Sequence, residues 1–143
     1  MSCWLCSGSW AGAGRHKLHA YVRLTKCQKS GGGPRWRSRW GAIAFDFGES
    51  NVGIGVSAAA SSKRQAKNGA LADCRAKGGQ NCRINLVYDN QCAVVIAGFG
   101  YSRSQSGPTV EIAAANGMKM CEESGAKECQ IYYKACSLPE QIQ

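Results

Sequence analysis

The sequence predicts an α+β domain of two layers, in which an antiparallel sheet is packed by two helices. We expect this domain to be built from an internal β-α-β duplication and to be stapled by disulfides. The main observation is a pattern that occurs twice, with an offset of 47 residues: Ser62, Ala66, Cys74, Gly78, Cys82 and Ile84, and then Thr109, Ala113, Cys121, Gly125, Cys129 and Ile131. A helix start, a helix body, a glycine stop and a strand start are therefore repeated as a unit.

A second observation is the uneven distribution of charge. The 143 residues leave room for one domain and carry a formal charge of +9. Residues 1–39 contain eight Lys and Arg but no Asp or Glu, whereas residues 40–143 contain ten Lys and Arg and nine Asp and Glu. We therefore expect 1–39 to be a basic segment that is disordered or non-native, 40–137 to be the duplicated cysteine-rich domain, and 138–143 to be a C-terminal tail.

The elements of the first half follow from apolar runs and helix signals. Residues 40–46 are apolar and predict a strand, 48–51 a turn, and 52–57 a shorter strand that forms a hairpin with the first. A helix is expected over residues 63–77, because Ser62 and Gln65 fit a capping box and two glycines follow at 78 and 79. Residues 82–88 predict a strand, followed by an Asp-Asn turn.

The second half repeats this order. Residues 92–97 are the most apolar strand, and residues 99–107 are predicted as a polar loop rich in Gly and Ser. The second helix begins at Thr109, after Pro108, and ends at Gly125. Its buried face is given by the helical spacing of Val110, Ala113, Ala114, Gly117, Met118 and Cys121. Residues 128–134 predict the last strand.

Six of the nine cysteines lie in the duplicated domain, an even number in repeated positions. This indicates a disulfide framework and an oxidising compartment, either periplasm or extracellular space. The glycine turns bring Cys74 to Cys82 and Cys121 to Cys129. Cys92 and Cys136 remain, and we expect them to pair between the two halves. A ferredoxin-like strand order would put these two at opposite ends of the sheet, so their pairing requires another sheet order or other loops. The alternative is six reduced, buried cysteines.

Several of these residues also occur together in a known family: Trp40-Gly-Ala-Ile-Ala, Ser62 with Ala66 and Ala70, Cys74 with Gly78 and Cys82, Cys92-Ala-Val-Val, and Cys121 with Cys129 and Cys136. Through them, residues 40–136 resemble the bacterial family called domain of unknown function 4189. The resemblance implies export, disulfides and a fold, but no particular chemistry.

Members of this family typically carry an export signal just before the Trp-Gly-Ala-Ile-Ala strand, where this chain has its basic segment. The segment lacks the apolar run of a signal peptide, and no stretch of the chain is apolar enough to predict a membrane span. Either the start is assigned too far upstream or in a disturbed frame, or the segment has its own role. The abrupt change at Trp40 favours the first interpretation.

We find no catalytic constellation. Residues 40–143 contain no His to activate a Cys or Ser nucleophile. Asp46, Glu49 and Asp89 lie in turns near strand ends and could supply convergent carboxylates for hydrolysis, but acids in turns are more often solvated turn formers.

Two further motifs lie in the basic segment. Cys3-x2-Cys6 with His16-x2-His19 has zinc-ligand types but short spacings, so we expect no metal and no cofactor. The interleaved Arg35, Trp36, Arg37, Arg39 and Trp40 suit phosphate contact and base stacking. A solvated or non-native basic run is the preferred interpretation.

We therefore expect a small exported, disulfide-stabilised binding module of inhibitor, immunity or host-interaction type, with no catalytic activity. The expected contact surface joins the 48–51 turn, with Glu49 and Asn51, to the 99–107 loop, where Phe99, Tyr101 and Arg103 are typical interface anchors. The expected partner is another protein. The alternatives are a secreted enzyme that uses turn carboxylates, or nucleic-acid or metal binding through the basic segment. The sequence does not predict the oligomeric state.

Overall fold

The computed structural model describes residues 32–46 and 53–143. Residues Gly33–Gln143 form one compact unit. Its elements are β1 (Trp36–Arg37), β2 (Trp40–Asp46), β3 (Ile54–Ala60), α1 (Lys63–Ala76), β4 (Cys82–Asp89), β5 (Cys92–Gly98), β6 (Tyr101–Gly107), α2 (Val110–Glu123), β7 (Gln130–Cys136) and β8 (Glu140–Gln141). All the strands and helices predicted from the sequence are found within three residues of their expected ends.

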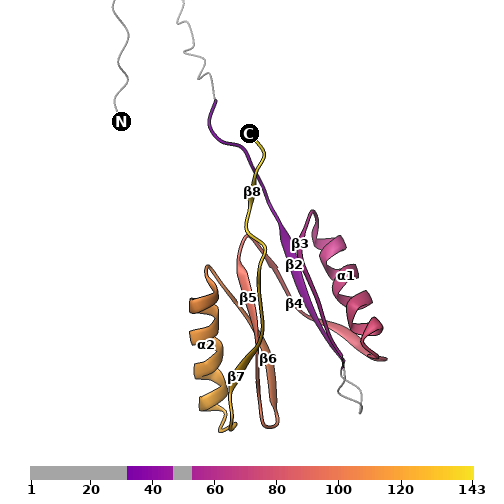
Figure 1. Cartoon of the computed structure of the whole chain (residues 1–143), viewed down its shortest axis with the longest axis vertical. Coiled ribbons are helices and arrows are strands. Elements are labelled where there is room, and N and C mark those ends of the chain that lie inside the picture. Colours follow the sequence, from indigo (N-terminus) through magenta and orange to yellow (C-terminus); the bar gives the residue numbers. More distant parts are fainter. Residues whose placement is uncertain (1–31, 47–52) are drawn as a thin grey trace, which may run out of the picture. The chain divides into compact units, whose positions relative to one another are not determined.

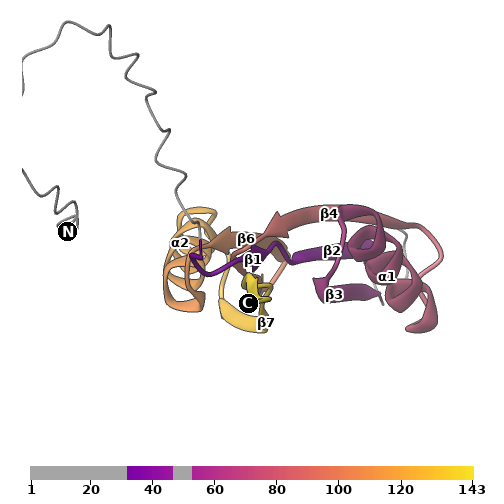
Figure 2. The ribbon, with the colours of Figure 1, turned by 90° about the horizontal axis from the view of Figure 1, so that it is seen from above.

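The strands form two three-stranded antiparallel sheets, of order β3-β2-β4 and β6-β5-β7, and a two-stranded ribbon of β1 and β8. The α+β class with two helices and antiparallel pairing is confirmed. The expectation of one sheet in two layers is corrected, because the strands divide into two sheets. Figure 1 shows α1 on the outer side of one sheet and α2 on the outer side of the other, and Figure 2 shows the same order from above.

The central strands explain why there are two sheets. Along β2, Ala42 and Ala44 pack toward α1, whereas Ile43 and Phe45 pack with residues of the other sheet. The central strand β5 alternates in the same way between α2 and the first sheet. A helix layer covers only one face of a sheet, so each sheet buries its second face against the other sheet.

Both halves share one order of elements, strand, strand, helix and strand, and each places its first strand in the middle of its sheet. The same local signals bound the two helices. The Ser62 hydroxyl accepts a hydrogen bond from the Gln65 N–H at 3.2 Å, and the Thr109 hydroxyl accepts one from the Ile112 N–H at 3.2 Å. The common origin of the two halves stays a prediction.

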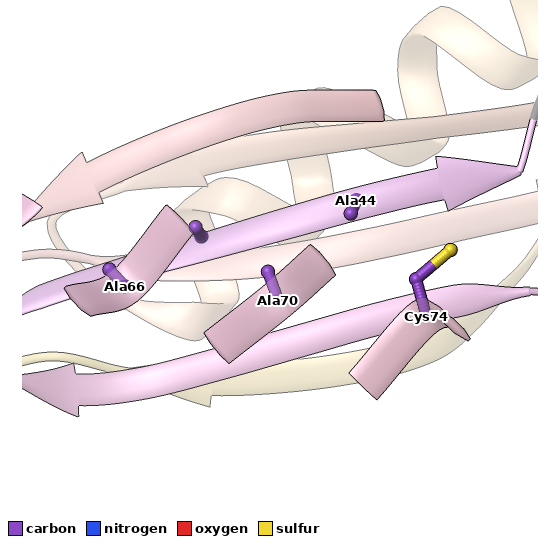
Figure 3. Close-up of a cluster of buried hydrophobic side chains, with 5 residues drawn as sticks. Ala44, Ala66, Ala70 and Cys74 are labelled. Atoms are coloured by element: carbon purple, nitrogen blue, oxygen red, sulfur yellow. The ribbon is translucent and has the colours of Figure 1, made fainter. Parts of the chain in front are cut away.

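Small residues let α1 lie close to its sheet. Figure 3 shows Ala66, Ala70 and Cys74 on one side of the helix, facing Ala44 of β2, and all four are fully buried. Gly55 of β3 also faces this helix, and a Cβ atom placed on it would lie 2.0 Å from the Ala70 carbonyl oxygen. The backbones of α1 and β3 are therefore in contact without intervening side chains.

A separate core cluster lies between the sheets. It consists of Ile43, Phe45, Tyr88, Ala93 and Val95, flanked by Ile54, Val56, Leu86 and Tyr133. The ring of Tyr88 lies across Gly41, where an added Cβ would come within 2.1 Å of the ring. Burial raises the pKa of the Tyr88 phenol. Burial also raises the pKa of Tyr133, and the nearby Tyr88 and Asp73 raise it further.

Three disulfides join the cysteine pairs that the sequence predicts: Cys74 with Cys82, Cys121 with Cys129, and Cys92 with Cys136. The first two each link the end of a helix to the start of the next strand. The expectation that Cys92 and Cys136 join the two halves is wrong. These residues are direct neighbours on β5 and β7, within the second sheet, because β5 is the central strand and pairs with β7.

Residues 101–107, predicted as part of a loop, form strand β6, and only Phe99 and Gly100 turn between β5 and β6. Seven residue pairs join β5 to β6, from Cys92 opposite Gly107 to Gly98 opposite Tyr101. A strand of this polarity is stable at the edge of a sheet, where its side chains meet solvent and its backbone pairs on one side. The sequence feature that indicates this strand is the alternation of Ser with Tyr, Arg and Gln over residues 101–106.

The two ends of the compact unit are joined by the β1–β8 ribbon. Trp36 lies opposite Gln141, and the side chains of Arg39 and Glu140 form an ion pair. The compact unit therefore includes residues on both sides of the 40–137 span expected from the sequence. Residues 1–31 of the basic segment lie outside the described residues.

Candidate partner-binding site

A pocket of about 500 Å³ lies where both long hairpins turn. The end of β2 and the β5–β6 turn lie at the lower end of the molecule in Figure 1. The first hairpin contributes Phe45, Asp46, Gly53 and Ile54, and the second contributes Gly98, Gly100, Tyr101 and Ser102. Equivalent hairpins of the two sheets therefore form opposite walls of one concave surface.

The pocket is lined by both apolar and polar residues. Phe45 and Ile54 belong to the cluster between the sheets, so the pocket continues that core toward solvent. Three of the lining residues are glycines, at 53, 98 and 100. A Cβ on Gly53 would lie 3.1 Å from the Cys74 sulfur, and one on Gly98 would lie 3.1 Å from the Cys121 sulfur, so these two glycines make room for the disulfides behind the pocket. Gly100 has no atom within 4 Å of an added Cβ, so a bound molecule can approach its peptide groups closely. Gly100 also has a positive φ of 72°, which other residues rarely adopt.

Asp46 is a buried carboxylate at the rim of this pocket. Its side chain accepts hydrogen bonds from the backbone N–H groups of Gln80 and Asn81, at 3.4 and 3.2 Å. Its own N–H donates to the Gly53 carbonyl at 2.8 Å. Asp46 thus ties the loop after α1 to the end of the β2–β3 hairpin, and it holds the wall of the pocket in position.

The carboxylates considered for hydrolysis do not all converge. Asp46 pairs with Cys82 at one end of β2, whereas Asp89 pairs with Trp40 at the other end. A strand of this length spans about 20 Å at about 3.3 Å per residue, which is too far for two acids to act on one bond. Glu49, the third acid, lies outside the described residues, as does Asn51.

The three predicted anchors lie at the β5–β6 hairpin. Phe99 stands at the tip with 85% of its surface exposed, and its N–H donates to the Lys127 carbonyl at 2.8 Å. Tyr101 is half-buried against the cluster under α2 and also lines the pocket. The guanidinium of Arg103 lies 6.0 Å from the centre of the Tyr101 ring, within the range of a cation–π contact.

Described residues next to both segments that the sequence suggested line one pocket. Asp46 and Gly53, which bracket residues 47–52, line the same pocket as Gly98, Gly100 and Tyr101. Sequence reasoning missed Phe45, Ile54 and the glycines, since apolar and glycine residues near strand ends are equally typical of ordinary hairpins. The internal repeat could have indicated the second hairpin, because residues 101–107 lie 47 residues after β3 and should therefore form the equivalent strand.

The structure tests the other proposed sites only in part. Within residues 32–46 and 53–143, no group of three or more His, Cys, Asp or Glu is placed to hold a metal ion. Cys3, Cys6, His16 and His19 lie outside those ranges. In the same ranges, no helix is long and apolar enough to span a membrane. Of the basic and aromatic run, Trp36 is exposed, whereas Trp40 packs against the core under α1.

A family model for a domain of unknown function, DUF4189, matches residues 40–136. The chain belongs to the DUF4189 family. The matched residues run from the start of β2 to the end of β7, so the DUF4189 domain contains both sheets, both helices and all three disulfides. Neither the curated proteins nor the solved structures include a match to this chain.

Proposed function

We propose that this DUF4189 protein is an exported binding module that recognises a segment of another protein at the pocket between its two hairpins. The proposal has three parts: a rigid scaffold, a contact surface with an anchor, and a location outside the reducing cytoplasm. Each part rests on a different observation.

The main observation behind this proposal is the exposure of Phe99. A phenylalanine with 85% of its surface exposed costs solubility and contributes nothing to the core of its own domain. Full burial of such a side chain in a partner stabilises a complex by about 1.5–3 kcal/mol. Its chain neighbours, Gly98 and Gly100, line the pocket, so a partner that covers Phe99 also reaches the pocket.

The chemistry of the pocket favours a peptide segment as the ligand. Phe45 and Ile54 offer an apolar surface to a side chain, and the open Gly100 leaves peptide groups that can pair with the main chain of a partner. Tyr101 and Arg103 beside it are residue types enriched at interface anchors. Arg103 is exposed and suits a partner with a carboxylate near its bound segment.

The scaffold supports export. Three disulfides in a chain of this size are compatible with an extracellular location. They hold the strand ends and helix ends that frame the fold, so the contact surface is organised before binding. Preorganisation of this kind lowers the entropic cost of association.

Alanine substitution at the hairpin tip tests the proposal. Wild-type protein, F99A and R103A are used to capture partners from the surroundings of the native cells, and the affinity for each captured protein is then measured. We expect F99A to weaken binding roughly thirty-fold, the effect of a hot-spot residue worth about 2 kcal/mol. The matched control is Y132A, which removes an aromatic side chain that is 64% exposed on β7. Equal affinities of wild type, F99A and R103A for every captured protein would contradict the proposal.

A further inference from the structure

The two helices carry opposite charges at positions related by the repeat. Arg64 and Arg75 lie on α1, and Glu111 and Glu122 lie 47 residues later, on α2. Within each pair the two residues are 11 positions apart, which is about three helical turns. The two charges of a pair therefore lie on the same side of their helix. All four side chains are exposed.

These four charges have no ion-pair partner within the described ranges 32–46 and 53–143. The ion pairs on the helices join Lys77 to Asp73 at 2.7 Å and Lys119 to Glu123 at 3.9 Å. A third ion pair joins Arg39, which follows β1, to Glu140 of β8. The arginines of α1 and the other two glutamates of α2 are thus available to a partner.

The fold does not require arginine on α1. The second helix has the same length and the same place in its half, and it carries glutamate at the corresponding positions. The first two turns of α1 hold Lys63, Arg64 and Lys67 and no acid in the first turn. Because the N-terminal end of a helix is the positive end of its dipole, bases there oppose helix stability. The basic face of α1 is therefore not explained by the stability of its own helix.

The residues between the charges allow another helix to approach. On α1, Asn68 and Ala72 are exposed and have short side chains. The corresponding residues on α2 are Ala115, which is small and exposed, and Lys119, whose ammonium lies 3.9 Å from Glu123. A hollow of about 340 Å³ lies beside Lys63, Arg64, Lys67 and Asn68. Figures 1 and 2 show the two helices on opposite outer sides of the molecule, so the two faces cannot meet within one chain.

We propose that the occupant of the α1 face is a second copy of this chain, which docks its own α2 there. The shared spacing of 11 residues lets both arginines meet a glutamate of the second copy, whether the helices run parallel or antiparallel. The contact uses different surfaces on the two copies, so each copy keeps one free face and association continues head to tail. Exposed ion pairs are individually weak and are screened by salt, so the assembly forms at low ionic strength.

The mass of the full chain in solution tests this proposal. We expect the weight-average mass from analytical ultracentrifugation to rise above the monomer mass of 15.3 kDa with increasing concentration at low salt. The comparison uses about 0.01 M salt, where the screening length is about 30 Å, and about 1 M, where it is about 3 Å. At high salt the mass should return to that of the monomer. A wild-type chain that stays monomeric at low salt would overturn the proposal.

Charge-reversed variants identify the surfaces. R64E/R75E and E111R/E122R should each be monomeric alone, and an equimolar mixture should associate, because the arginines of one variant then meet the glutamates of the other. The matched control is R83E/K134E, which makes the same change in net charge as R64E/R75E at exposed strand positions and should associate like the wild type.

The other outcomes count against the α1 face. Equal loss of association in R83E/K134E would show an effect of net charge alone. Loss in E111R/E122R but not in R64E/R75E would mean that another basic segment meets α2. A mixture of the two charge-reversed variants that stays monomeric would also overturn the proposal.

Discussion

Removal of the disulfides one at a time tests how the framework stabilises the domain. The perturbation is replacement of both cysteines of a pair with alanine in the full chain. The cysteines are 8 residues apart in Cys74–Cys82 and Cys121–Cys129, and 44 residues apart in Cys92–Cys136. The loop-entropy relation then predicts losses of about 2.5 kcal/mol for each short loop and about 4 kcal/mol for the long one.

The difference in stability between the variants depends on loop length alone. Cys74 and Cys121 are fully buried, and Cys92 is 3% exposed, so the packing lost with each sulfur pair is comparable. That contribution cancels when two variants are compared. The remaining difference in the free energy of unfolding depends on the ratio of the loop lengths and amounts to about 1.5 kcal/mol.

The assay is reversible urea unfolding of C74A/C82A, C121A/C129A and C92A/C136A, with the other disulfides intact. The first two variants are controls for each other, because their loops and burial match, and their free energies of unfolding should agree within about 0.5 kcal/mol. C92A/C136A should be the least stable of the three. A C92A/C136A variant as stable as the short-loop variants would refute the entropic reasoning.

Two further predictions concern the α1 side. G55A should lower the free energy of unfolding by about 1–3 kcal/mol through overpacking, because its Cβ would lie 2.0 Å from the Ala70 carbonyl. G33A, with no atom within 4 Å of the added Cβ, should leave urea unfolding unchanged, and equal stability of the two variants would contradict the close packing. The hydrogen bond from Lys77 lowers the pKa of the Asp73 carboxyl below its ordinary value, so the carboxylate stabilises the fold at pH values above the ordinary pKa, and this contribution is lost as the pH falls through the lowered pKa. D73N should therefore show a smaller loss of stability than wild type between pH 5 and pH 2, and identical pH profiles would exclude this role.

The helices could be predicted from the sequence because their end signals are local. Gly78 and Gly125, predicted as helix stops, adopt positive φ angles of 96° and 81° just after the two helices. Ser62 and Thr109 accept the hydrogen bonds expected of N-caps. These signals act within a few residues of the chain, so tertiary packing did not override them.

The sheet arrangement depends on contacts between segments far apart in sequence. Ile43 and Val95 pack together from different sheets, and no local pattern states which sheet a strand joins. One available clue was the apolar run of β2 and β5, which lacks the alternation of a strand with one exposed face. A strand buried on both faces requires a layer on each side, and a two-layer domain does not provide it.

The partner-binding role of the hairpin end stays a prediction, and the lining of the pocket found there was not predicted from the sequence. Phe99 and Tyr101 were selected as interface residue types, and both lie at the hairpin end. The pocket itself is made by Phe45 and Ile54, whose neighbours from the other hairpin are about 50 residues away in sequence. A concave surface of this kind follows from the facing of the two sheets, so it could not be derived before the sheets were known.

We propose that the protein works as a disulfide-stabilised module outside the reducing cytoplasm. The most direct measurement is peptide mapping by mass spectrometry, without reduction, of protein isolated from its native cells and alkylated during extraction. We predict three linked peptide pairs, Cys74 with Cys82, Cys92 with Cys136 and Cys121 with Cys129, and no alkylation at these six positions. Alkylated, unlinked cysteines at those positions would contradict the claim, because the scaffold would then exist in a reduced form in the cell.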